Sequence, residues 1–151
     1  MAEAVIVEAV RSPVGKRNGG LSGVHPAELS AQVLNGLVQR AGVDPALVDD
    51  VIWGCVMQAG EQALDIGRTA LLTAGWPESV PGVTVDRQCG SSQQSVHFAA
   101  AGVVAEAMVA LAKPAVSDSH KATVSWRSVN KATRSDSVKV IAFSYFAFVH
   151  R

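Results

Sequence analysis

The sequence predicts an α/β fold in which helices cover a mostly parallel sheet. Over residues 4–109, short apolar runs rich in Val and Ile alternate with helical segments in the order β-α-β-α-β-α. Such an order favours right-handed crossovers between parallel strands. All 13 glycines lie between Gly15 and Gly102, where they separate these segments. A chain of 151 residues with 48% hydrophobic and 17% charged residues is typical of a globular protein with its own core.

Composition predicts the first strand, and capping residues predict the first helix. Ala4–Val10 is short, apolar and rich in Val, as a buried strand is. A glycine-rich loop follows it. Pro26 then suits the first position of a helix, and Gly42 suits the position just after its end. His25 stands at the helix entry, where its side chain could cap the free N–H groups.

Two further strands and two further helices follow in alternation. Val51–Met57 and Val83–Gln88 are apolar enough to be strands, and Asp65–Gly75 between them is expected to be helical. The last helix carries apolar residues at steps of three and four from Val96 to Met108, and its other side is apolar too. A helix that is hydrophobic nearly all round is expected to lie in the core.

Cys89 falls between the third strand and the last helix, in the stretch TVDRQCGSS. Chemistry gathers at the carboxyl ends of parallel strands, where a helix begins. The free N–H groups of Gly90, Ser91 and Ser92 would stabilise a thiolate there, and the N–H of Cys89 could donate to an oxyanion. Free cysteine is, however, among the most buried residue types and usually only packs. The spacing alone leaves both a nucleophile and a packed side chain open.

The other candidate residues are weaker. Cys55 lies inside an apolar strand and is expected to pack. His97 lies eight residues after Cys89, which is roughly 12 Å along a helix and beyond the reach of a general base. His120 and His150 lie in an atypical tail. The two cysteines have neither disulfide nor zinc spacing, so no metal site is expected.

Three segments carry a resemblance to a known family. They are AVIVEAVRSPVGKRNGGLSGVHPAEL, VDDVIWGCVMQAG and DIGRTALLTAGWPESVPGVTVDRQCGSSQQSVHFAA. Together they resemble the N-terminal half of the thiolases, the acyl-CoA C-acyltransferases, nearly without gaps from Ala4 to about Ala105. The Asp-Arg-Gln-Cys-Gly-Ser-Ser form is more similar to the bacterial thiolases of lipid catabolism.

The resemblance implies a chemistry. Cys89 would be the nucleophile that holds an acyl group as a thioester. The reaction would be thiolysis of a 3-oxoacyl-CoA or condensation of acetyl-CoA. Coenzyme A and acyl-CoA would be substrates, with no covalently bound cofactor and no metal. The resemblance further implies a homo-oligomer, a dimer or a tetramer, when the full fold is made.

The resemblance stops near residue 109, which predicts two regions. Residues 1–109 would be an incomplete thiolase N-terminal domain, and residues 110–151 an atypical, basic, glycine-free tail. Residues 1–112 carry six Lys/Arg against eleven Asp/Glu, whereas residues 113–151 carry seven against two. No position matches the family's Gly-Gly-x-Glu-Ser-Met-Ser segment, its Gly-His-Pro histidine or its Cys-x-Gly-Gly-Gly cysteine. We therefore expect a truncated chain with a frameshifted or poorly ordered tail. The alternative to an acyltransferase is an inactive remnant that retains at most a dimer contact.

The tail ends in one strongly apolar stretch. VKVIAFSYFAFV has high β-propensity and no proline, which predicts either a buried strand or an aggregation-prone segment. It is too short to span a membrane, and the scattered basic residues do not form a nucleic-acid-binding patch. The first residues lack the features of a signal peptide. The sequence thus favours a cytoplasmic protein without membrane or nucleic-acid partners.

Overall fold

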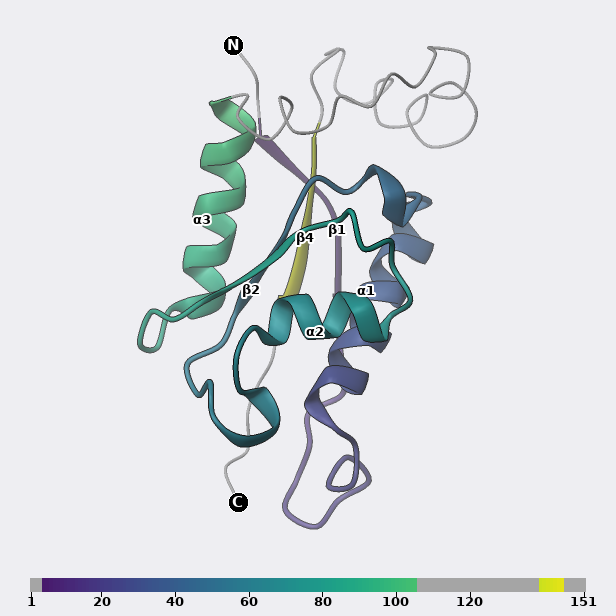
Figure 1. The fold of residues 1–151 in the computed structure, drawn as a ribbon, viewed down its shortest axis with the longest axis vertical. Coiled ribbons are helices and arrows are strands. Elements are labelled where there is room, and N and C mark those ends of the chain that lie inside the picture. The colour runs from purple at the N-terminus through teal and green to yellow at the C-terminus, as the bar shows by residue number, and fades with distance from the viewer. Residues whose placement is uncertain (1–3, 106–138, 146–151) are drawn as a thin grey trace.

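The computed structural model describes residues 4–105 and 139–145. Its main elements, shown in Figure 1, are β1 (Ala4–Arg11), α1 (Pro26–Ala41), β2 (Val51–Gly54), α2 (Ile66–Thr73), β3 (Gly82–Val85), α3 (Ser91–Val104) and β4 (Lys139–Tyr145). Two short 3-10 helices, Pro45–Leu47 and Gly60–Gln62, lie in the connections. The predicted alternation of strands and helices is confirmed.

All the paired strands are parallel, as predicted. β2 pairs with β3 in a register that runs from Val51 opposite Gly82 to Gly54 opposite Val85. β1 pairs with β4, from Ala4 opposite Lys139 to Arg11 opposite Tyr145. Within the described residues these strands form two separate two-stranded sheets rather than one. α3 packs on β2 and also contacts β1 and β4, so it connects the two sheets (Figure 1).

Local capping sets the ends of the helices. Pro26 is the first residue of α1, and the Nδ1 atom of His25 accepts a hydrogen bond from the N–H of Ala27 at 3.2 Å. α1 ends at Gly42, whose φ of 65° is a left-handed conformation that glycine adopts at little cost. The carboxylate of Asp65 caps α2 by accepting from the N–H of Arg68 at 3.0 Å. The capping predictions for His25, Pro26 and Gly42 are confirmed.

The main core lies between α1, α2 and β2. Burial of its apolar side chains is the dominant stabilising contribution to this part of the fold. The Nε1–H of Trp76 donates to Oδ1 of Asn35 at 2.8 Å, which satisfies the polar atom of a largely buried indole. The buried members of the cluster are Ala27, Leu34, Val51, Trp53, Cys55, Ile66, Ala70, Leu71, Trp76 and Val80.

Two predictions about burial are wrong. β1 is half-buried rather than buried, and its Ile6 is 63% exposed. α3 is not a core helix: Phe98 is 50% exposed, and the residues it buries are Ser91, Ser95 and Val103. The reason is that α3 lies along the side of the strands, and no other described helix packs on its outer face.

The strands near Cys89 are shorter than predicted. β2 ends at Gly54 instead of Met57, and β3 spans Gly82–Val85 instead of Val83–Gln88. After β2 the chain leads into the 3-10 helix Gly60–Gln62 and α2, and after β3 it turns to enter α3. Met108 lies outside the described residues. β4 lies in the region that the sequence assigned to the tail, and the boundary near residue 109 stays a prediction.

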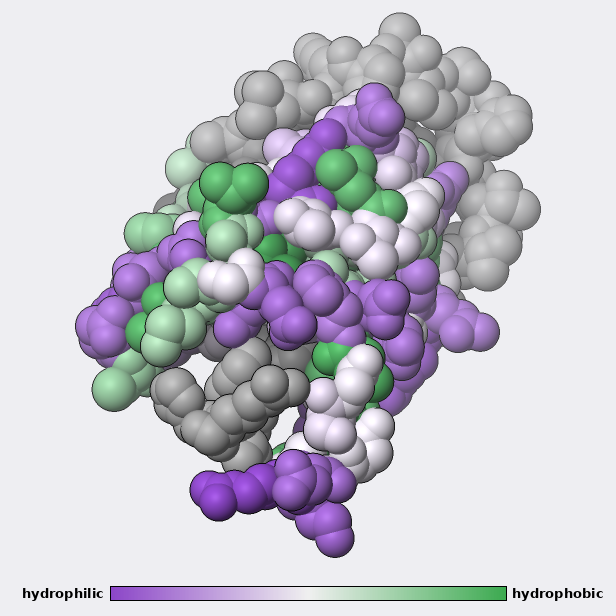
Figure 2. Space-filling model, turned by 60° about the horizontal axis from the view of Figure 1, so that its bottom comes forward, coloured by the Kyte–Doolittle hydropathy of each residue, from purple (hydrophilic) through white to green (hydrophobic). Residues whose placement is uncertain are grey.

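Across the described part of the chain, every helix falls short of the length and apolarity that crossing a bilayer requires. On the face shown in Figure 2, hydrophobic residues form small patches separated by hydrophilic ones.

Candidate functional site

A tight turn carries Cys89 from β3 into α3. The N–H of Gly90 donates to the carbonyl of Arg87 at 2.8 Å, which closes the turn around Gln88 and Cys89. The hydroxyl of Ser91, the first residue of α3, lies 3.0 Å from both the N–H and the carbonyl oxygen of Arg87. The thiol of Cys89 is free and exposed. The turn therefore presents the sulfur to solvent at the start of a helix.

The backbone of Cys89 is strained. Its φ of 59° lies in the left-handed region, which costs a residue with a Cβ roughly 1–2 kcal/mol. Such conformations persist only where the surrounding structure imposes them, and they cluster at functional sites. A sharp strand-to-helix turn that exposes a nucleophile is a known arrangement of this kind. The strain at Cys89 therefore makes this position a candidate functional site, although Asn18 and Leu64 also have positive φ among the described residues.

The start of α3 is pressed against β2 at Gly54. A Cβ atom added to Gly54 would lie 2.3 Å from the backbone N of Ser92 and 2.5 Å from the carbonyl carbon of Ser91. Only glycine fits such an approach without a shift of the helix. Gly54 thus sets how closely the helix that follows Cys89 can approach the sheet.

One of the N–H groups that the sequence predicts to be free at the start of α3 is not free. The N–H of Gly90 is used by the turn, because it donates to Arg87, so it is not available to an anion. Among the described residues, no acceptor is found for the N–H of Cys89. Gly90 precedes the helix and provides no side-chain cap. The N–H of Cys89 therefore stays a candidate oxyanion donor.

Arg87 places a positive charge beside the turn. The Nη1 atom of Arg87 would be 3.2 Å from a Cβ atom on Gly90. The guanidinium therefore lies over the residue that follows Cys89. A cation and a helix N-terminus both favour a negative charge nearby.

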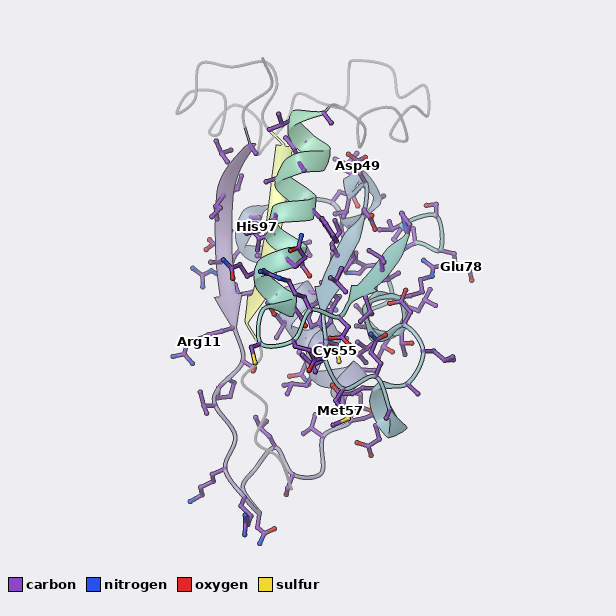
Figure 3. The ribbon with its side chains drawn as sticks, turned by 90° about the vertical axis from the view of Figure 1, so that its left-hand side faces the viewer. Arg11, Asp49, Cys55, Met57, Glu78 and His97 are labelled. Atoms are coloured by element: carbon purple, nitrogen blue, oxygen red, sulfur yellow. The ribbon has the colours of Figure 1, made fainter. Side chains whose placement is uncertain are left out.

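Cys55 has the opposite character. It is 9% exposed, and its backbone N–H donates to the carbonyl of Val85 at 3.0 Å, next to the end of β3. Its thiol donates to Oε1 of Gln62 at 3.4 Å and lies 3.5 Å from the carbonyl oxygen of Met57. Burial raises the pKa of the Cys55 thiol, and the negative charge of Asp86 raises it further. Cys55, labelled in Figure 3, is a packed thiol, as expected.

The remaining sequence candidates do not join Cys89. His97 lies on the exposed side of α3, away from Cys55 in Figure 3, and His25 caps α1. His120 and His150 lie outside the described residues. In the part of the chain that the structure describes, no cluster of three or more His, Cys, Asp or Glu side chains could hold a metal.

An open groove of about 960 Å³ lies elsewhere, along β1 and α1. Its lining combines apolar side chains with two arginines, and Cys89 is not among the lining residues. The residues that line it are Ile6, Ala9, Val10, Arg11, Pro13, Gly36 and Arg40. Cys89 lies at an exposed turn outside this groove.

Comparison with known proteins decides the family. The family model for the thiolase N-terminal domain matches residues 4–141. The chain belongs to the thiolase family.

The similarity to individual thiolases is high but covers a limited part of their length. The steroid 3-ketoacyl-CoA thiolase FadA6 of Mycobacterium tuberculosis is 56% identical over 104 residues, which are 69% of this chain and 26% of that protein. A 3-ketoacyl-CoA thiolase of Saccharophagus degradans is 49% identical over 68% of this chain and 27% of its own length. The crystal structure of the Bacillus anthracis acetyl-CoA acetyltransferase superposes with a TM-score of 0.64 at 45% identity, over 68% of this chain and 26% of that one. The chain thus spans about a quarter of the length of these thiolases.

Sequence inspection missed the role of Gly54 and the role of the Ser91 hydroxyl at this turn. A single glycine inside an apolar strand, such as Gly54, can mark a close backbone approach. A serine such as Ser91 often bonds to nearby backbone at a helix start. The sequence contains both patterns, but neither pattern identifies the backbone segment that the residue contacts.

Proposed function

We propose that Cys89 is the nucleophile of a thiolase-type acyltransferase that exchanges acyl groups between coenzyme A thioesters. The observation that carries the proposal is the exposed, strained Cys89 at the strand-to-helix turn of a thiolase-family chain. We further propose that the substrates are acyl-CoA thioesters and that the reaction is either 3-oxoacyl-CoA thiolysis or acetyl-CoA condensation.

The chemistry proceeds in two stages. In the condensation direction the Cys89 thiolate attacks the thioester carbonyl carbon, the bond from that carbon to the coenzyme A sulfur breaks, and coenzyme A leaves as a thiolate that takes up a proton. In the thiolysis direction the thiolate attacks the 3-oxo carbon instead, the C2–C3 bond breaks, and acetyl-CoA leaves as an enolate that takes up a proton at C2. In both directions the carbonyl oxygen under attack becomes an oxyanion, and the acyl group stays on Cys89. In the second stage an incoming coenzyme A thiolate or a carbon nucleophile removes the acyl group and restores Cys89.

Residues around the turn support the first stage. The N–H of Cys89 has no acceptor among the described residues, which supports its proposed role as a donor to the oxyanion on the acyl group. The guanidinium of Arg87 lies beside the turn that carries Cys89, 3.2 Å from the position of a Cβ atom on Gly90. Cys55 is the less suitable nucleophile, because burial raises the pKa of its thiol.

The relatives support the substrate class. Two of them are called 3-ketoacyl-CoA thiolases, and a structural neighbour is called an acetyl-CoA acetyltransferase. We infer that this chain takes acyl-CoA thioesters and acts as part of a homo-oligomer. Neither a membrane nor a nucleic acid is part of the proposal, and the proposed location is the cytoplasm.

Acylation of Cys89 tests the proposal. The full chain is incubated with acetyl-CoA or acetoacetyl-CoA and digested, and the peptide that contains Cys89 is weighed by mass spectrometry. We expect an acyl mass on that peptide, its loss in Cys89→Ala, and its retention in Cys55→Ala. An unmodified Cys89 peptide in the wild-type chain would contradict the proposal.

One observation favours a second candidate. The sequence contains no match to the family's Gly-His-Pro histidine or to its second cysteine motif, which the resemblance assigns to activation of the nucleophile and to the second stage. The second candidate is a chain that keeps the thiolase N-terminal fold and a dimer contact without turnover. It predicts self-association of the chain without acylation of Cys89, which analytical ultracentrifugation and the same mass measurement would distinguish.

A further inference from the structure

We propose that Ser91 is a positioning residue for Cys89, because its hydroxyl holds the turn that keeps Cys89 in the left-handed conformation. The inference rests on the proposed role of Cys89 as the nucleophile. It concerns a side chain that would not touch the substrate but would decide where the sulfur points.

The Ser91 hydroxyl joins the two ends of the turn. It accepts from the N–H of Arg87 and donates to the carbonyl oxygen of the same residue, each at 3.0 Å. Gln88, Cys89 and Gly90 are thereby enclosed between Arg87 and the first residue of α3. Ser91 is only 7% exposed, so water cannot readily take the place of its hydroxyl.

The enclosed segment is the one that contains the strained residue. Cys89 has a φ of 59°, a conformation that an unconstrained cysteine rarely adopts. The bond from the Gly90 N–H to Arg87 also closes the turn, at 2.8 Å, but it leaves the Arg87 N–H without a partner. Among the described residues, only the Ser91 hydroxyl accepts from that N–H, so its loss favours rearrangement of the turn.

The conformation of Cys89 determines the position of its sulfur. A change in φ rotates the Cα–Cβ bond relative to the N–H of the same residue, which moves the thiolate relative to its oxyanion donor. Small displacements of a nucleophile have large effects on rate, up to about 100-fold for 1 Å. Without this constraint the left-handed conformation of Cys89 becomes less populated by its equilibrium cost, which corresponds to a factor of roughly ten. We therefore expect acyl transfer to slow by roughly tenfold or more.

Ser95 provides a matched control. It lies one turn further along α3, it is 6% exposed, and its hydroxyl donates to the carbonyl of Ser91 at 3.0 Å. Ser95→Ala therefore removes a buried hydroxyl and a hydrogen bond of the same length from the same helix, but leaves the turn around Cys89 intact. Ser91→Thr keeps a hydroxyl at the proposed position and serves as the rescue variant.

The test combines a conformational measurement with a rate. In the isotopically labelled full chain, a residue with positive φ gives a strong intraresidue NOE between its amide proton and its Hα, because these atoms are close. We expect Ser91→Ala to lose this strong NOE at Cys89 and to slow acylation by acetyl-CoA, while Ser91→Thr and Ser95→Ala keep both. Amide exchange at Arg87 in the wild-type chain should be slow, and this measurement needs no variant to fold.

Each contrary result would overturn the inference. A strong Cys89 NOE retained in Ser91→Ala, an equal loss in Ser95→Ala, or rapid exchange of the Arg87 amide would each remove Ser91 as the cause. Absence of acylation in the wild-type chain would refute the proposed function instead. The NOE and the exchange rate would still decide the role of Ser91 in that case.

Discussion

Replacing Gly54 by alanine should displace the helix that begins after Cys89. The new Cβ atom would lie 2.3 Å from the backbone N of Ser92, whereas ordinary contact begins at 3.4 Å. The obstacle is backbone in the first turn of α3, so the helix start must retreat by about 1 Å rather than a side chain rotating away. Overpacking of this kind costs about 1–3 kcal/mol and sometimes more, and we expect Gly54→Ala to cost at least ~2 kcal/mol.

Urea unfolding followed by circular dichroism measures this cost, with Gly36→Ala as the matched control. Gly36 lies within α1, and a Cβ atom there would meet nothing within 4 Å. Alanine is the better helix former, so Gly36→Ala should stabilise the chain by about 0.5–1 kcal/mol. The two substitutions add the same methyl group and should act in opposite directions. An unchanged unfolding midpoint for Gly54→Ala would refute the close approach of α3 to β2.

Three further predictions follow from the burial and capping of single residues. Iodoacetamide should alkylate Cys89 at least about tenfold faster than Cys55, because burial raises the pKa of the Cys55 thiol. Burial, together with repulsion from Asp65, raises the pKa of Asp50. Asp50→Asn should therefore stabilise the chain at pH 7, by ~0.5 kcal/mol, a value reduced to allow for solvent screening of this half-buried side chain. Asp65→Ala should cost about 1 kcal/mol through loss of the α2 cap, whereas Asp65→Asn should retain most of the stability.

The pH dependence of the Asp50 effect has a definite sign. A raised pKa means that the folded chain binds the proton more tightly than the unfolded chain, so stability falls as the pH rises from about 3.9 through the raised pKa. The advantage of Asp50→Asn should therefore shrink as the pH falls from 7 toward 4 in urea titrations. An advantage that stays constant with pH would show that the cause is not charge.

The other two predictions have equally direct tests. Peptide mass mapping after timed alkylation follows both cysteines in one sample, and equal rates would mean that Cys55 is not protected. For Asp65, thermal unfolding of the alanine and asparagine variants separates the cap from the charge. Equal losses in both variants would assign the effect to the carboxylate charge rather than to the hydrogen bonds from Arg68 and Thr84.

The sequence by itself determined the order of the elements, the caps of α1 and the place of Cys89 between a strand and a helix. These features depend on residues only a few positions apart. His25 accepts a hydrogen bond from the N–H of Ala27, and Gly42 follows the last residue of the helix that it caps. The spacing of hydrophobic residues along a helix or strand is likewise a local feature. Because these interactions are local, they can be predicted from the sequence alone.

Only the tertiary structure decided which surfaces meet. It showed that α3 is not a core helix and that Gly54 lies against the backbone of Ser92. It also showed that Cys55 lies beside the end of β3, and that Cys89 is held at positive φ. Burial and close approach depend mainly on residues far apart in the chain, and backbone strain depends on what surrounds a residue. A hydrophobic pattern shows that a surface will be covered, but it does not show what will cover it.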